Sequence, residues 1–323
     1  MSYPTTRLRR LRYNKAIRDL VDDTNLSTTD LIYPIFVCEG KNIKKEIQSM
    51  PGQYQLSIDN VLKTCDELVS KNINSIILFG IPSKKDEEGL VAIDKNGIVQ
   101  RAIKEIKKNN KNILVIVDVC NCQYTTHGHC GTIKDGDVDN DSTLKNLGSQ
   151  ALSLVNAGAD VIAPSDMMDG RVKYIRDILD KSNYHKIPIF SYSIKYASSF
   201  YGPFRNATDI STNFTDRKTY QMSFKSSNEA LREAEMDIKE GVDVIIIKPA
   251  LSYLDILYKI KSKYNIPVIA YNVSGEYSML KAASEKKWIK SKETIIEILT
   301  SMKRAGANAI ITYHALEVSD YLN

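Results

Sequence analysis

Eight short apolar segments, spread along the whole chain, most strongly limit the folds available to it. They lie at 31–37, 75–81, 113–119, 160–165, 187–193, 243–250, 266–273 and 308–315. Their apolar residues are continuous rather than alternating, which is typical of strands buried on both faces of a parallel sheet. Helical periodicity separates them at 57–71, 97–109, 142–157, 170–181, 227–240, 252–264 and 291–305. Strands that alternate with helices predict an α/β fold.

A weak internal repeat indicates which α/β fold this is. "NAGADVIAP" (156–164), "KEGVDVIII" (239–247) and "RAGANAIIT" (304–312) each place a glycine at a helix end, shortly before a strand. Glycine suits the left-handed position that ends many helices. Eight such units in a chain of 323 residues predict a (β/α)₈ TIM barrel. A doubly wound open sheet is the rival, but no G-x-G-x-x-G follows the first strand.

The chain divides into a barrel and an arm. We expect residues 26–323 to form one catalytic barrel domain, because barrels of this size are commonly single domains. Residues 1–25 are rich in arginine and poor in apolar residues, so they cannot belong to the barrel core. We expect them to form an extended N-terminal arm that either lies in solvent or packs on a neighbouring subunit.

Composition excludes several classes of function. No run of 18 apolar residues is present, and no apolar signal-peptide segment follows the basic N-terminus, so we expect a cytoplasmic protein with no membrane partner. The net charge is +5, and lysine-rich runs lie at 41–45 and 107–113. No zinc-finger spacing or RNA-binding aromatic motif accompanies them, so we interpret them as solvated helix faces rather than a nucleic-acid site.

Reactive side chains follow six consecutive predicted strands, at the barrel end where catalytic groups gather. They are Asp118 to Cys122, Ser165 with Asp166, Lys195, Lys248, Ser274 and Tyr313. Lys248 follows three isoleucines, so burial should favour its neutral amine, the form that attacks a carbonyl to make a Schiff base. A second ammonium, at Lys195, would strengthen that effect. The alternative is a lysine that turns outward to solvent at the strand end.

The segment 196–225 is a candidate active-site lid. It shows no helical periodicity and is rich in aromatic residues, which argues against disorder. Arg205 and Arg217 lie in it and could hold a carboxylate through paired hydrogen bonds. Ordinary surface arginines are the alternative.

Three of the five cysteines, Cys120, Cys122 and Cys130, cluster after the third strand. A disulfide scaffold does not suit a reducing compartment or a chain with this much core. Three thiolates with an open fourth position would suit a catalytic zinc that holds a substrate amine or carbonyl. Unliganded thiols are the alternative, and His127 and His129 could be ligands, proton carriers or structural residues.

Long motifs now give the chain a resemblance to a known family. They are "DVCNCQYTTHGHCG", "SDMMDGRV", "SYSIKYASSFYGPFRNA", "VIIIKPALSYLDI" and "YNVSGEYSML", with "SMPGQYQLS", "LFGIPSKKDEEG" and "IITYHA". Together they resemble the porphobilinogen synthase family, also called delta-aminolevulinic acid dehydratase, over essentially the whole chain. The resemblance implies a hydro-lyase that condenses two molecules of 5-aminolevulinate to porphobilinogen, with loss of two waters, in haem and tetrapyrrole biosynthesis.

The resemblance also implies roles for particular residues. Lys248 and Lys195 would be the Schiff-base lysines, for the substrates that become the propionate and acetate sides respectively. The second substrate's carboxylate would be held by Arg205, Arg217 and Gln221, and the first's by Ser274 and Tyr313. The zinc-type version of the site would use Cys120, Cys122 and Cys130, and Asp118 is a candidate for proton transfer.

Two features of the resemblance concern regulation and assembly. Glu233 occupies the position of an allosteric magnesium ligand in bacterial members, although a surface glutamate on an amphipathic helix is the alternative. Thr219 stands where some zinc members have a cysteine for a second zinc, which argues against that second ion here. The arm resembles one that embraces a neighbouring barrel, commonly in an octamer.

Two rival functions share parts of this pattern. A class I aldolase-like barrel also uses a lysine on the sixth strand, but it needs neither a second lysine nor three cysteines. A metal-storage or metal-sensing barrel would keep the fold and the thiols without turnover. A test for pyrrole formation from 5-aminolevulinate would separate all three.

Overall fold

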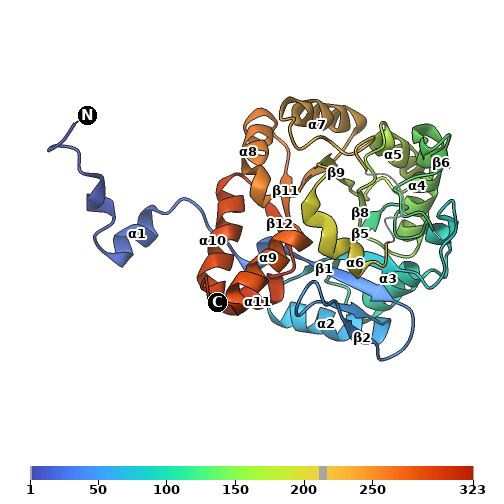
Figure 1. Ribbon diagram of the computed structural model, residues 1–323, viewed down its shortest axis with the longest axis horizontal. Coiled ribbons are helices and arrows are strands. Elements are labelled where there is room, and N and C mark those ends of the chain that lie inside the picture. The colour runs from blue at the N-terminus through green and yellow to red at the C-terminus, as the bar shows by residue number, and fades with distance from the viewer. Residues whose placement is uncertain (1, 211–216, 323) are drawn as a thin grey trace.

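A computed structural model describes residues 2–210 and 217–322, and its centre is a barrel of eight parallel strands (Figure 1). They are β1 (Leu31–Cys38), β4 (Ser75–Ile81), β5 (Leu114–Val119), β8 (Val161–Pro164), β9 (Phe190–Lys195), β10 (Val244–Lys248), β11 (Val268–Asn272) and β12 (Ala309–Thr312). Their hydrogen-bonded order is β8-β5-β4-β1-β12-β11-β10-β9. A parallel bridge from Ile162 to Ile189, just before β9, brings the two ends of this sheet together. The predicted TIM barrel is confirmed.

The helices surround the strands, as Figure 1 shows. Those predicted from periodicity are α2 (Ile58–Ser70), α3 (Ile98–Asn109), α4 (Asn140–Asn156), α5 (Arg171–Lys181), α7 (Asn228–Glu240), α8 (Leu254–Lys263) and α10 (Ser291–Arg304). Besides α1 (Lys15–Val21) and α6 (Gly202–Ala207), which are described below, α9 (Ser274–Glu285) and α11 (Ala315–Leu322) were not predicted. Each begins within three residues of a strand end, so its first turn merges with the apolar run of that strand in the sequence.

The three repeated glycines have the predicted conformation. Gly158, Gly241 and Gly306 follow α4, α7 and α10 with φ of 105°, 95° and 113°. Residues with a Cβ rarely adopt these angles, so glycine lets each helix end and the chain turn into the next strand.

Side chains alternate between the two faces of the barrel wall. Ile245 and Ile247 of β10 pack outward among the helices, in the large core cluster between strands and helices. Ile246 points inward, in a second cluster with residues such as Tyr192 and Tyr271. Because strand side chains have a period of two, Lys248 lies on the inward face with Ile246. The interior is filled by side chains, so the chemistry is confined to its ends.

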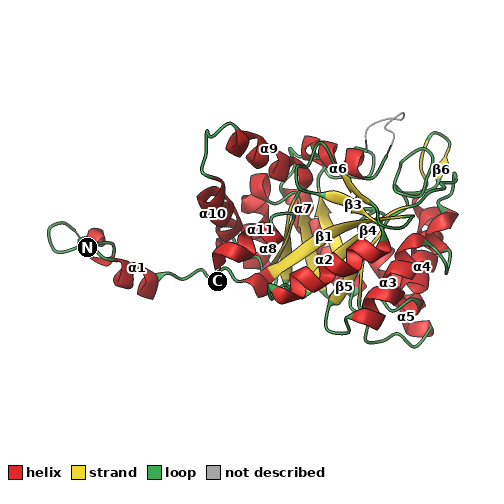
Figure 2. Ribbon diagram, turned by 90° about the horizontal axis from the view of Figure 1, so that it is seen from below, coloured by secondary structure: helices red, strands yellow, loops and turns green. Residues whose placement is uncertain are grey.

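The N-terminal arm lies apart from the barrel. It contains a short 3₁₀ helix, η1 (Leu8–Leu11), and the helix α1 (Lys15–Val21), neither of which buries a residue. Figures 1 and 2 show it extending away from the barrel beside α10. Neither helix of the arm therefore contributes to the barrel core.

The predicted lid differs in part from the expectation. Its first half contains η4 (Ser199–Tyr201) and a helix, α6 (Gly202–Ala207), although the sequence shows no helical period there. A helix of six residues is too short to reveal a period of 3.6. Residues 211–216 of the lid lie outside the described residues. Within the described part of the chain, no helix is long and apolar enough to cross a membrane.

Two small hairpins complete the fold near the lid end of the barrel (Figure 2). In the first, β2 (Lys44–Glu46) pairs with β3 (Tyr54–Leu56), and in the second, β6 (Ile133–Lys134) pairs with β7 (Asp137–Val138). The second hairpin follows directly after the cysteine cluster.

Candidate active site

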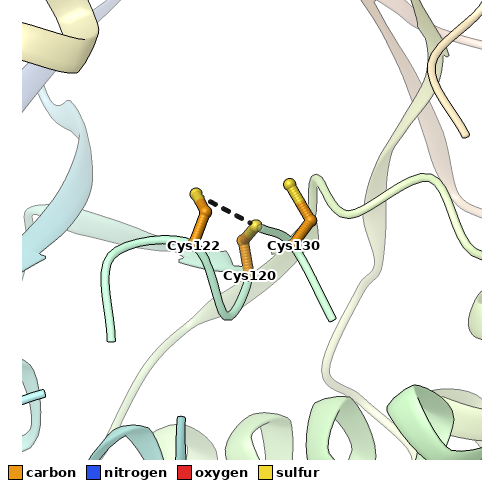
Figure 3. A group of neighbouring side chains, drawn as sticks. All are labelled: Cys120, Cys122 and Cys130. Atoms are coloured by element: carbon orange, nitrogen blue, oxygen red, sulfur yellow. Dashed lines mark hydrogen bonds between the residues drawn. The ribbon is translucent and has the colours of Figure 1, made fainter. Parts of the chain in front are cut away.

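The three clustered cysteines come together after β5. Their sulfur atoms lie within 4.8 Å of one another, and all three residues are buried. Cys120 and Cys122 Sγ are 3.3 Å apart, and the three side chains point to the same side of the loop (Figure 3). In residues 2–210 and 217–322, no other group of three His, Cys, Asp or Glu side chains is drawn together in this way. The cluster could therefore bind a metal ion.

The environments of the three thiols shift their pKa values in different directions. Burial raises the pKa of Cys120 well above its usual value. Hydrogen bonds from the other two thiols lower the pKa of Cys130 well below its usual range. His127 and His129 are not part of the metal-ligating group, and both make hydrogen bonds within the structure. The structural interpretation of the two histidines is therefore the better one.

Lys195 and Lys248 end two neighbouring strands and lie opposite each other. They are register partners in the β9–β10 pair, and their exposed fractions are only 5% and 6%. The register shifts by one residue between Ile245 and Ile247, which places one extra residue in β9. Because of this β-bulge, Lys195 pairs with Lys248. Without the extra residue, Ile194 would occupy that position. The Nζ of Lys195 donates to the carbonyl of Ser165 at the end of β8.

Lys248 lies in an aromatic pocket. Its Nζ is 4.4 Å from the ring centroid of Tyr271, 4.9 Å from that of Phe204 and 5.2 Å from that of Tyr192. Burial, followed by the charge of Lys195, lowers the pKa of Lys248 to about 7. A substantial fraction of the side chain is therefore a neutral amine at neutral pH. The alternative that this lysine turns outward to solvent is wrong, because the strand places it inward.

Asp118 is the buried carboxylate nearest the lysines along the rim. Burial raises its pKa to about 6, although the charges of Lys195 and Lys248 act in the opposite direction. Its Oδ2 accepts a hydrogen bond from Gln123 Nε2 at 3.2 Å, while Gln123 Oε1 accepts one from the backbone of Gly80 at 3.1 Å. Its Oδ1 is buried, and a hydrogen bond from the Ser165 side chain also acts to lower its pKa. Asp118 is thus a fixed carboxyl group with a pKa of about 6.

The lid contributes two arginines and a glutamine. Burial and the neighbouring Arg217 lower the pKa of Arg205, so the two cations repel each other across the same space. Among the described residues, Arg205 Nε and the amide nitrogen of buried Gln221 have no hydrogen-bond partner. Arg217 donates to the carbonyl of Gly128 at 2.7 Å and to Cys130 Sγ at 3.7 Å. Adjacent cations with unused donors form a site suited to an anion.

Ser274 and Tyr313 lie at the ends of β11 and β12. The hydroxyl of Ser274 accepts a hydrogen bond from the backbone of Phe204 at 3.0 Å and lies 3.3 Å from the carbonyl of Phe200. It therefore holds the lid as well as facing the site. The hydroxyl of Tyr313 lies 3.1 Å from that of Tyr271, which also contacts Lys248. Both predicted residues are buried at the rim.

Glu233 lies away from this rim, on α7. It lines a pocket of about 660 Å³ whose other charged residues include Asp169, Glu229 and Arg232. Burial raises the pKa of Glu233 to about 7. The structure thus separates this residue from the barrel-end group that contains the other predicted site residues.

Several residues of the site were not predicted from the sequence. Tyr192 and Tyr271 face Lys248, and Gln123 holds Asp118. The two tyrosines carry a signal that could have been used, because each lies on a predicted strand at an inward-facing position. Gln123 carries no such signal, because its amide is oriented by the backbone N–H of Gly80 at the end of β4, which lies far from it in the sequence.

Comparisons with known proteins agree with this geometry. The chain matches the family described as Delta-aminolevulinic acid dehydratase over residues 5–321. The delta-aminolevulinic acid dehydratase of Bacillus subtilis (strain 168) is 52% identical over 322 residues, covering 100% of this chain and 99% of the relative. That of Methanothermus sociabilis is 54% identical over 318 residues, covering 98% of this chain and 99% of the relative.

A solved structure extends the comparison to three dimensions. It is the delta-aminolevulinic acid dehydratase (porphobilinogen synthase) of Toxoplasma gondii ME49, in complex with the reaction product porphobilinogen. The match has a TM-score of 0.96 at 44% sequence identity, and it covers 98% of this chain and 91% of that chain. The two proteins therefore share the same fold over nearly the whole of this chain.

Proposed function

Because the chain belongs to the delta-aminolevulinic acid dehydratase family, we propose that its barrel-end site condenses two molecules of 5-aminolevulinate to porphobilinogen. Two molecules of water are lost, which makes the enzyme a hydro-lyase of porphyrin biosynthesis. The observation that carries this assignment is the in-register pair of buried lysines, Lys195 and Lys248, at the ends of β9 and β10. An aldolase-like or metal-storing barrel would not need such a pair.

The lysines act as nucleophiles toward the keto groups of the two substrates. The neutral amine of Lys248 attacks the first keto carbon, and the resulting carbinolamine loses water to leave an imine. Lys195 does the same with the second substrate, so the two imine-forming steps release the two waters. Closing the pyrrole ring returns both lysines as free amines. Asp118, with a pKa near 6, is the carboxylate placed to move a proton beside them.

The substrates' carboxylates have separate binding groups. Arg205, Arg217 and Gln221 of the lid would hold the second substrate, the acetate side of the product, because two neighbouring cations and an amide can donate to one carboxylate. Ser274 and Tyr313 would hold the first, the propionate side, next to Lys248. Binding both substrates in fixed positions converts a bimolecular condensation into a reaction within one complex.

The thiol cluster fits a zinc ion. Cys120, Cys122 and Cys130 offer three soft donors, buried and already within 4.8 Å of one another, which is the donor set that zinc prefers. Zinc bound there would supply an electrophilic centre that holds the second substrate by its amine or carbonyl. Arg217, 3.7 Å from Cys130 Sγ, would offset the negative charge of three thiolates.

Assembly and regulation form a separate part of the proposal. Glu233 would bind an allosteric Mg²⁺, since this ion keeps most of its water ligands and needs only one or two carboxylates. The arm would pack on a neighbouring barrel in a homo-octamer. The five cysteines are all free thiols, and a thiolate site requires reducing conditions, so we place the enzyme in the cytoplasm.

Incubation with 5-aminolevulinate, followed by Ehrlich's reagent, tests the reaction. Wild-type protein should form the coloured pyrrole adduct, and Lys248→Ala should form none. Lys286→Ala, at an exposed lysine outside the site residues, is the matched control and should retain full activity. A wild-type preparation that forms no pyrrole with zinc present would contradict the proposal.

Chelation and metal analysis test the zinc assignment. A strong chelator should abolish activity, and Zn²⁺ should restore it better than Mg²⁺. Cys130→Ala should also lose bound zinc, whereas Cys65→Ala, at a buried cysteine outside the cluster, should retain it. Full activity in a demonstrably zinc-free sample would refute the assignment.

A further inference from the structure

The end of the lid, residues 217–222, contacts the loop that carries the three cysteines. Besides the two hydrogen bonds of Arg217 to Gly128 and Cys130, Thr219 Oγ1 donates to Asp137 Oδ1 at 2.9 Å in the hairpin that follows. Arg217 thus contacts the cysteine loop itself, and Thr219 contacts the hairpin that follows it.

Tyr220 lies at the centre of this contact. Its hydroxyl is 3.1 Å from His129 Nδ1, and the backbone N–H of Cys130 points to it at 3.5 Å. The ring packs against the cluster formed by the three cysteines and Ile210, edge-on to the ring of His129 at 6.1 Å. The hydroxyl therefore contacts both residues of the cysteine loop.

His129 is itself held in place on the cysteine loop. Its backbone N–H donates to His127 Nδ1 at 3.0 Å, and its carbonyl accepts from Thr125 Oγ1 at 3.1 Å. Tyr220 therefore hydrogen-bonds to a loop whose conformation is already defined around Cys130. A change in that loop would be transmitted directly to the tyrosine hydroxyl.

The other end of the same segment contacts a Schiff-base lysine. The Met222 N–H donates to the carbonyl of Lys195 at 3.1 Å, and the Ala197 N–H donates to the carbonyl of Met222 at 2.8 Å. These bonds form a parallel bridge between Tyr196 and Met222. Six residues thus connect the cysteine loop to the strand of Lys195, with Gln221 buried between them.

We propose that Tyr220 is a positioning residue that latches the lid to the cysteine loop, so that metal binding and lid docking stabilise each other. The inference rests on the proposed metal site. A metal held by Cys130 fixes the backbone N–H and the neighbouring histidine that the hydroxyl contacts. By linkage, a docked lid must favour the metal-bound loop to the same degree. Arg217 and Gln221, on either side of the latch, are then held where the second carboxylate binds.

Tyr220→Phe tests the latch by removing only the hydroxyl. Its matched control is Tyr264→Phe, which removes a hydroxyl that donates to the Leu231 carbonyl at 2.8 Å, away from the rim. Zinc affinity, measured by competition with a chromogenic chelator, should fall about three- to tenfold in Tyr220→Phe, the effect of one neutral hydrogen bond. The amides of 217–222 in zinc-loaded Tyr220→Phe should exchange hydrogen as fast as those of metal-free wild type. KM should rise more than kcat falls, because substrate binding is affected more than chemistry.

Thr219→Val provides a second, independent change in the same segment. It removes the bond to Asp137 and should speed exchange in 217–222 in the same direction, by less, because that bond is exposed. Tyr264→Phe should match wild type in zinc affinity and in exchange of this segment.

Two results would overturn the latch. One is wild-type zinc affinity and wild-type exchange in Tyr220→Phe. The other is weaker zinc binding with unchanged exchange of 217–222, which would confine the tyrosine to the cysteine loop. Failure of the metal proposal gives a third, different result, in which wild-type protein binds no zinc at the thiols. That result would also refute the coupling between metal binding and lid docking.

Discussion

At the scale of single residues, the two lysines are equally buried but differ in what surrounds their amino groups. Lys248 is surrounded by aromatic rings, whereas Lys195 donates to the Ser165 carbonyl where the strand meets the lid. We predict that Lys248 captures the first 5-aminolevulinate. Borohydride added under single-turnover conditions should leave the label on the peptide that contains Lys248. Lys195→Ala should still trap one substrate yet form almost no pyrrole, and Lys248→Ala should lose both. Label found mainly on Lys195 of the wild type would reverse the order.

The pKa of Lys248 predicts the pH dependence of that first capture. A lysine with a lowered pKa is charged below it and neutral above it, and only the neutral amine attacks the ketone. Trapping rates should therefore rise as the pH passes through about 7. Lys195→Met, which removes the neighbouring cation, should move the midpoint upward, whereas Lys195→Arg retains the charge and should leave it near wild type. Equal midpoints in both variants would show that burial alone lowers the pKa.

At the scale of elements, the lid's 3₁₀ helix η4 and α9 meet at a glycine. A Cβ on Gly275 would lie 2.5 Å from the Phe200 carbonyl oxygen and 2.7 Å from the Phe200 Cα. These are backbone atoms and cannot rotate aside, so Gly275→Ala must separate the lid from the start of α9, where Ser274 contacts it. We predict that this variant loses about 1–3 kcal/mol of unfolding free energy. KM for 5-aminolevulinate should also increase.

Gly202→Ala, in the lid helix α6, is the matched control. An added Cβ there meets no heavy atom within 4 Å, and φ is −50°, which alanine readily adopts. Its stability should be unchanged or higher by about 0.4–1 kcal/mol, because alanine restricts the unfolded chain. Thermal or urea unfolding and steady-state kinetics compare the two variants. If they behaved alike, the close approach at Gly275 would not position the lid.

At the scale of the whole molecule, the arm exposes apolar side chains. Packing them against a neighbouring subunit would remove their apolar surface from water and stabilise the assembly. Leu8 and Leu20 are 69% and 83% exposed, and neither helix of the arm buries a residue. We predict that full-length protein assembles to an octamer, promoted by Mg²⁺, and that deleting residues 1–25 yields smaller assemblies. Light scattering with and without Mg²⁺ measures the difference. Glu233→Gln should retain the arm-dependent contacts but lose the response to Mg²⁺. If the size of the assembly depended on neither the arm nor Mg²⁺, the arm and Glu233 would have roles other than assembly.

Local sequence properties determined most of the architecture. Continuous apolar runs and helical periods predicted all eight barrel strands and seven of the helices, because burial on both faces of a strand and on one face of a helix leaves a direct trace in residue order. The three glycines after α4, α7 and α10 were predicted because glycine readily adopts the left-handed conformation that ends many helices. Lys248, the lid arginines and the three cysteines could be predicted as candidates from their sequence neighbours. The lysine follows three isoleucines, the arginines lie in a long aromatic-rich segment, and the cysteines are clustered.

Only the tertiary structure decided how these candidates are arranged. The bulge in β9 places Lys195 beside Lys248, and nothing in "SYSIK" shows where the extra residue is absorbed, since register depends on the neighbouring strand. The pairing of Gln123 with Asp118, the aromatic pocket of Lys248 and the contact of Tyr220 with His129 likewise join residues from different elements. A sequence records which side chains are present, but desolvation, charge proximity and hydrogen bonding act over a few ångströms in space, and only the folded barrel sets those distances.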